Sequence, residues 1–151
     1  MYDLLLKRRI PKGHDWAGLS DTVKRAFRWP LEGLLFGVEE AGLWWPEWGE
    51  RPSEEADRGA VVAEVVAKAP KLIPLMGHRY LPARPHQVGN PVFSVYQSDI
   101  IVYGANLQDW MLVEFGPRSD RKPGQIPHTI DFWSLAVSRH GDAKFYPFAE
   151  G

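Results

Sequence analysis

The sequence predicts a single α+β domain over residues 1–151, with a mixed, mostly antiparallel sheet packed against several helices. A length of 151 residues suits one domain rather than two. Two runs rich in β-branched and aromatic residues, 92–96 and 100–103, are separated only by Gln97–Asp99, which favours an antiparallel hairpin with a short loop. Helical patterns occur before and after these strands in irregular order, as is typical of the α+β class.

The first predicted helix runs from about Asp21 to Arg28, with Ser20 as its N-cap. Pro30 is expected to end it, because proline breaks helices and disfavours helical geometry in the residue before it. The apolar run that follows, 34–38, is short and suits a strand or an extended segment. Residues 1–30 are therefore predicted to form an N-terminal extension that contains this first helix.

A second and longer helix is predicted between Ser53, as its N-cap, and Pro70, which stops it. Its broad apolar face indicates that it packs on a sheet. The segment 71–75 is expected to be extended, and Pro74 places it at a sheet edge or a strand end.

Two further helices are predicted after the hairpin. Asn106 is expected to cap a helix that reaches about Phe115, with Asp109 completing a variant of the capping box. The last helix is short and covers about 130–139.

The segment 42–49 holds three of the seven tryptophans, Trp44, Trp45 and Trp48. Pro46 and the flanking glycines exclude a regular element, so these residues are predicted to form a loop tied down by large side chains. Aromatic side chains stabilise small cores, and anchoring is the expected role for at least two of the three. The alternative is that the rings stack on a sugar or cradle a peptide.

The segment 77–86 concentrates polar and aromatic side chains in what the two prolines predict to be a rigid loop. A stiff loop loses little entropy on binding, and an arginine offers a planar fork to carboxylates. Arg79 is the residue expected to contact an anionic partner. Internal scaffolding by bonds to backbone carbonyls is the competing interpretation. The predicted binding residues are His78, Arg79, Tyr80, Arg84 and His86, with Trp44, Trp45 and Trp48 as neighbours.

Catalytic signals are missing from the sequence. The five histidines include no pair at helical zinc spacing, and no nucleophile elbow, P-loop or dinucleotide-binding pattern occurs. No catalytic residue, metal or cofactor is therefore assigned, and the chain is predicted not to be an enzyme. One enzymatic alternative remains, a hydrolase built on His78 and Arg79 with Asp99 or Glu47, which requires these groups to converge in one pocket.

Charge and composition limit the partners. Eighteen basic and nineteen acidic residues give a net charge of −1, whereas phosphate-tracking proteins carry a basic excess, so nucleic acid is not an expected partner. There is no cysteine, and no apolar run reaches the roughly 20 residues that span a bilayer. These features predict a cytoplasmic protein without a membrane partner, and they leave its oligomeric state open.

Several sequence runs resemble bacterial members of the SUKH superfamily, which also includes yeast regulators of cell-wall assembly. The matching runs are GHRYLP, GNPVFSVYQSDIIVYG and the later pair Asp109-Trp110, with WWPEWGERP upstream and IDFWSLAV downstream. The resemblance covers roughly residues 34–137. It implies an α+β fold with a mostly antiparallel sheet backed by helices. Many bacterial members resemble immunity proteins that neutralise a cognate toxin, and no catalytic residues accompany the resemblance.

The leading hypothesis from the sequence is a non-enzymatic, cytoplasmic protein-binding domain, with a bacterial toxin-immunity protein as its specific form. The partner would then be a protein, such as a toxin, held by the segment 77–86 and its neighbours. Two alternatives stay open: a small-ligand or carbohydrate-binding module that uses the Trp-rich loop, and a hydrolase.

Overall fold

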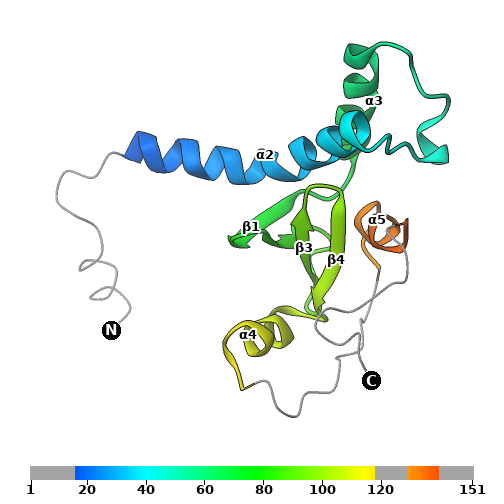
Figure 1. The fold of residues 1–151 in the computed structure, drawn as a ribbon. Coiled ribbons are helices and arrows are strands. Elements are labelled where there is room, and N and C mark those ends of the chain that lie inside the picture. The colour runs from blue at the N-terminus through cyan, green and yellow to red at the C-terminus, as the bar shows by residue number, and fades with distance from the viewer. Residues whose placement is uncertain (1–15, 118–128, 140–151) are drawn as a thin grey trace.

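The computed structural model describes residues 16–117 and 129–139 of the chain (Figure 1). The α+β class is confirmed. The elements in chain order are α2 (Trp16–Glu40), the short 3₁₀ helix η1 (Pro46–Trp48), α3 (Glu55–Lys68), β1 (Leu72–Met76), β2 (Arg79–Pro82), β3 (Val92–Tyr96), β4 (Asp99–Gly104), α4 (Leu107–Phe115) and α5 (Trp133–Arg139).

The four described strands form a sheet in the order β1-β2-β3-β4, and every neighbouring pair is antiparallel. The predicted hairpin is confirmed as β3 and β4, joined by a turn at Gln97 and Ser98. The extended segment predicted at 71–75 is β1, an outer strand of this sheet. No parallel pair occurs among the described strands, so the sheet in this part of the chain is antiparallel rather than mixed.

Residues directly opposite each other in an antiparallel pair point to the same face. Tyr80 pairs with Phe93 and Phe93 with Val102, and all three are buried, which marks the core face of the sheet. Arg79 pairs with Ser94 on the opposite side, which we call the open face. The open face also carries exposed residues from the outer strands.

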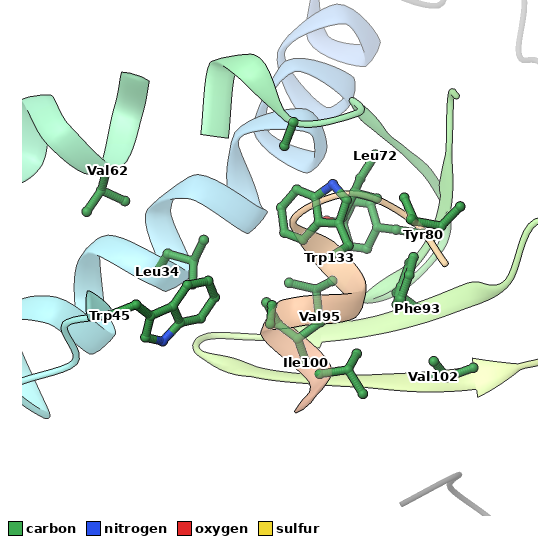
Figure 2. Close-up of a cluster of buried hydrophobic side chains, with 14 of the residues drawn as sticks. Leu34, Trp45, Val62, Leu72, Tyr80, Phe93, Val95, Ile100, Val102 and Trp133 are labelled. Atoms are coloured by element: carbon green, nitrogen blue, oxygen red, sulfur yellow. The ribbon is translucent and has the colours of Figure 1, made fainter. Parts of the chain in front are cut away.

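Helices α2 and α5 cover the core face, as Figure 2 shows for Leu34 and Trp133. Trp133 is 1% exposed, and its indole N–H donates to the Pro70 carbonyl oxygen over 2.7 Å. This bond ties α5 to the end of α3 and satisfies the buried indole donor. Helix α4 lies at the other end of the sheet from α2 (Figure 1).

Helix α2 overturns three sequence predictions. It begins at Trp16, so Ser20 lies inside the helix and is not its N-cap. It continues through Pro30 to Glu40 instead of ending at residue 30, and the apolar run 34–38 is helical instead of extended. Leu34 and Val38 are four residues apart and are both fully buried, so this run presents one helical stripe to the core. The predicted boundary between an extension and the domain therefore falls inside a helix.

The helix tolerates Pro30 because another element supplies the missing hydrogen bond. Proline has no N–H, so the carbonyl oxygen of Ala26, four residues earlier, has no partner within the helix. The Tyr80 hydroxyl, from β2, donates to this oxygen over 2.9 Å. Pro30 is itself buried where α2 meets the sheet. The sheet thus completes the helix at the position where proline interrupts it.

Two glycines let α2 touch the β3–β4 turn directly. A methyl group on Gly33 would lie 2.7 Å from the Gln97 Cα, and one on Gly37 would lie 2.8 Å from the Ser98 Cβ. Real Cβ atoms essentially never come so close, so the helix and the turn pack backbone to backbone at this point. These two positions require glycine because any side chain would clash with the turn. An unusual backbone conformation is not the reason.

The C-terminal end of α2 is fixed to the start of α3. Gly42 has a φ of +66°, a left-handed conformation that suits the residue after a helix. Arg58 of α3 donates to both carboxylate oxygens of Glu39, and these hydrogen bonds hold the pKa of Glu39 below its ordinary value. The predicted cap of α3 was wrong by one residue. Its N-cap is Glu54, with no side-chain cap bond, and the Ser53 carbonyl accepts from Arg58.

The predicted cap of α4 is confirmed. The Asn106 side chain accepts from the Asp109 N–H over 2.8 Å, and the Asp109 carboxylate accepts in return from the Ala105 N–H. The last helix is also present, although α5 begins at Trp133 instead of residue 130.

The Tyr80→Phe exchange should lower the free energy of unfolding by about 1–3 kcal/mol, because it leaves the Ala26 carbonyl oxygen without a partner. The exchange should cost less in a Pro30→Ala background, where residue 30 regains the N–H that can bond Ala26. Urea unfolding of the wild type, the two single variants and the double variant measures the coupling free energy between Tyr80 and Pro30. Tyr96→Phe, at a side chain that is 54% exposed, is the control and should change stability little. If Tyr80→Phe lowered the free energy of unfolding equally in both backgrounds, the Tyr80 hydroxyl would not replace the hydrogen bond that Pro30 removes.

Gly33→Ala should destabilise the protein by about 1–3 kcal/mol, because the new methyl group forces the helix and the Gln97 backbone apart. Gly59→Ala is the matched control within α3. Its methyl group would meet only the Leu35 Cδ2 atom at 3.9 Å, so helix propensity should dominate and raise stability by about 0.5–1 kcal/mol. In thermal unfolding, the melting temperature should fall for Gly33→Ala and rise for Gly59→Ala. Two shifts in the same direction would contradict this packing.

Candidate functional site

The segment 77–86 is not the single rigid loop that the sequence predicts. Gly77, with a φ of +56°, and His78 form the turn between β1 and β2. Residues 79–82 are strand β2, and only the part after Pro82 is a loop. The strand separates the predicted binding residues into two groups, because successive side chains point to opposite faces.

Arg79 lies on the open face and is held by three contacts. Its Nη1 donates to the Ser94 hydroxyl over 3.0 Å, and its guanidinium carbon lies 3.6 Å from the centre of the Tyr103 ring. Its Nε lies 3.5 Å from the Oε2 of Glu114 on α4. The side chains of Arg79 and Glu114 are 15% and 21% exposed, so the pair is mostly removed from water. These contacts fix Arg79 on the open face through side chains, whereas the competing interpretation expected bonds to backbone carbonyls.

The Arg79–Glu114 pair is incomplete as a hydrogen-bonded contact. Among the described residues, the buried Arg79 Nε and Glu114 Oε2 have no hydrogen-bond partner, and neither has the buried indole nitrogen of Trp110 on α4. Buried donors and acceptors are normally satisfied. The contact between α4 and the sheet is therefore held mainly by charge attraction and ring packing.

His78 stands beside this pair at the turn end of the sheet. Its ring contacts the Tyr96 ring with centroids 5.5 Å apart, and its backbone oxygen accepts from the Val95 N–H. Partial burial lowers the pKa of His78 below the ordinary 6.5, and the positive charge of Arg79 lowers it further, while Glu114 opposes the shift. His78 is therefore favoured in its neutral form.

The other three predicted residues of this segment do not join Arg79. Tyr80 is 1% exposed and lies in the core, so it is not available to a partner. Arg84 and His86 are exposed in the loop after β2, away from the turn that holds His78. Asn90 orders this loop by donating to the Pro82 and Pro85 carbonyl oxygens.

The Trp-rich loop is a core anchor. Trp45 and Trp48 are 6% and 9% exposed, with ring centroids 4.7 Å apart. Trp44 is half-buried, packs edge-on against Trp48, and donates its indole N–H to the Gly49 carbonyl. Trp45 also contacts Phe132, which precedes α5. The three rings thus pack against one another, and Trp45 and Trp48 belong to the core.

Two of the residues that the hydrolase alternative names, Glu47 and Arg79, form ion pairs with different helices. Glu47 pairs with Arg139 of α5, whereas Arg79 pairs with Glu114 of α4. Within residues 16–117 and 129–139, no three His, Asp or Glu residues are grouped closely enough to hold a metal ion. In the same part of the chain, no helix has both the length and the apolar character needed to cross a membrane.

The open face contains exposed residues that the sequence analysis missed. Ile73, Met76 and Tyr96 are 39%, 43% and 54% exposed, and they surround the fixed Arg79. Ile73 and Met76 come from β1 and Tyr96 from β3. The alternation along 92–96 could have assigned Tyr96 to the same face as Ser94, but the pairing of β1 with β2 gives no comparable local signal.

The chain matches no protein-family model, and no curated protein or solved structure gives a significant match. The resemblance to the SUKH superfamily therefore stays a prediction from the sequence.

The lowered pKa of His78 predicts a pH dependence of stability. The unfolded chain binds a proton at His78 near pH 6.5, whereas the folded protein binds it at lower pH. The stabilisation is thus complete above pH 6.5 and is lost as the pH falls through the lowered pKa. His78→Gln should flatten the fall in the free energy of unfolding between about pH 7.5 and 5 relative to the wild type. An NMR titration midpoint for His78 at or above 6.5 would contradict the shift.

Proposed function

We propose that the chain is a non-enzymatic protein-binding domain that contacts its partner through the open face. The observation that carries this proposal is the group of exposed side chains Ile73, Met76 and Tyr96 around Arg79. Tyrosine, methionine and arginine are enriched at protein interfaces, where large rigid side chains contribute most of the affinity. The face of an antiparallel sheet that is open to water usually carries polar residues, whereas this face exposes apolar groups.

The structure changes the expected role of Arg79. Its charge is already opposed by Glu114, and its ring contact with Tyr103 fixes the guanidinium in place. Arg79 therefore supports the proposal as the ordered centre of the surface, and the surrounding apolar groups supply the contact area. A preformed surface of this kind binds with little loss of side-chain entropy.

The specific form of this proposal is a bacterial, cytoplasmic immunity protein that occludes a cognate toxin. The resemblance of several sequence runs to the SUKH superfamily supports it. Co-expression with a toxin encoded beside the gene is the direct test. Protection of the cells supports immunity, whereas continued killing by every neighbouring toxin would remove this form of the proposal.

Met76→Asp and Tyr96→Asp should each weaken partner binding by tenfold or more, because each places a charge in the apolar contact region. Val88→Asp makes the same kind of change at a side chain that is fully exposed in the loop before β3, and it should leave binding unchanged. The measurement is quantitative pull-down from the native host, with circular dichroism to show that all variants are folded. Equal recovery of the partner by all three variants would exclude the open face as the binding surface.

A further inference from the structure

A second surface, separate from the open face, lies between α2, α3 and the start of β1. It is a hollow of about 220 Å³, which we call the α2–α3 groove. Small side chains on α3, including Ala63 and Ala67, leave this space between the two helices. Its lining residues are Phe27, Arg28, Pro30, Leu31, Ala63, Val66, Ala67, Ala69, Pro70, Lys71, Leu72 and Trp133.

The base of the groove is apolar and held in place. Leu72 and Trp133 are 2% and 1% exposed, and the indole of Trp133 is bonded to the Pro70 carbonyl. Leu31, from α2, is half-buried and packs against the core. Helices α2, α3 and α5 and strand β1 thus build the walls of the groove.

The charged residues that line the groove are both basic. Arg28 and Lys71 are exposed, and no Asp or Glu belongs to the lining. The Lys71 Nζ lies 5.4 Å from the centre of the Phe27 ring, and the contact of Arg28 with Glu32 is long, at 3.9 Å, and solvent-exposed. Exposed pairs of this kind contribute little, so both cations are available to a ligand.

The apolar surface continues from the groove along α2. Phe27 is 37% exposed, and Val23, four residues earlier on the same side of the helix, is 49% exposed. The N-terminal half of α2 extends past the sheet (Figure 1). Lys24 lies one turn before Arg28 on the helix, and its Nζ is 4.0 Å from the Asp21 carboxylate.

We propose that the α2–α3 groove binds an acidic segment of a partner protein that inserts one large apolar side chain. The charge supports an acidic partner, because both lining charges are positive. The size and openness support a protein segment, because about 220 Å³ encloses one side chain and leaves the flanking residues to run along α2. This inference does not depend on the open face, which lies on the other side of the sheet.

The test uses a series of acetylated and amidated heptapeptides with glutamates on both sides of one central residue. The central residue is Phe, Trp, Leu or Ser, and a second series has lysine in place of glutamate. NMR titration of the ¹⁵N-labelled full chain should show saturable shifts at the amides of Ala63, Ala67 and Lys71. Binding should require both the acidic flanks and a large apolar centre.

Two variants test the two parts of the site. Lys71→Glu should weaken binding about fivefold or more at 0.15 M salt, since it replaces an attraction by a repulsion. Lys68→Glu makes the same charge change outside the lining, where Lys68 pairs with Glu64, and should alter binding less than about twofold. Ala67→Leu should fill the hollow and weaken binding about tenfold or more, with folding checked by circular dichroism.

Three outcomes would overturn the proposal. They are no saturable binding of any acidic peptide, equal loss in Lys71→Glu and Lys68→Glu, or shifts confined to the open face. A concentration-dependent dimer in sedimentation that Ala67→Leu abolishes would also overturn it, because the occupant would then be a second copy of this chain. Met76→Asp and Tyr96→Asp should bind the peptides normally, so failure of the open-face proposal is distinguishable from failure of this one.

Discussion

The backbone contact between α2 and the β3–β4 turn is the constraint on which the arrangement depends. Gly33 and Gly37 allow the helix to meet Gln97 and Ser98 without intervening side chains. Because the helix lies this close to the turn, the face of α2 that carries Leu34 packs into the core. Helices then close the core face of the sheet, and α4 contacts the opposite face through Glu114 and Arg79. Both candidate surfaces are results of where α2 lies.

The proline within α2 shows which part of this fold local sequence can predict. The β3–β4 hairpin and the cap at Asn106 are predicted correctly, because each depends on neighbouring residues, whereas strand β2 is predicted as a loop. Pro30 fails as a helix stop because its missing donor is replaced by Tyr80, fifty-four residues away from Ala26 in the chain. Local propensity cannot include a hydrogen bond that only the folded sheet provides.

The same distinction applies to the predicted binding residues. The composition of 77–86 draws attention to Arg79, but the residue that restrains it, Glu114, lies on a different element. Strand alternation then separates Tyr80 from Arg79, which a loop would not do. The tryptophans are predicted as anchors by their size, and Trp45 and Trp48 are buried as that argument requires. The groove left no signal in the sequence, because it arises where small residues on α3 face α2.

The two candidate surfaces differ in the physics of binding that each can support. On the open face the mostly buried cation Arg79 is already opposed by Glu114, so association there has to rely on apolar contact around Tyr96 and should depend weakly on salt. In the groove the cations Arg28 and Lys71 have only weak internal contacts, and attraction to an acidic segment is screened as salt rises. The sheet and the packed core lie between the open face and the groove, so a partner can bind at one surface without contacting the other. A partner that covered only one surface would therefore reveal which one it uses by the salt dependence of its affinity alone.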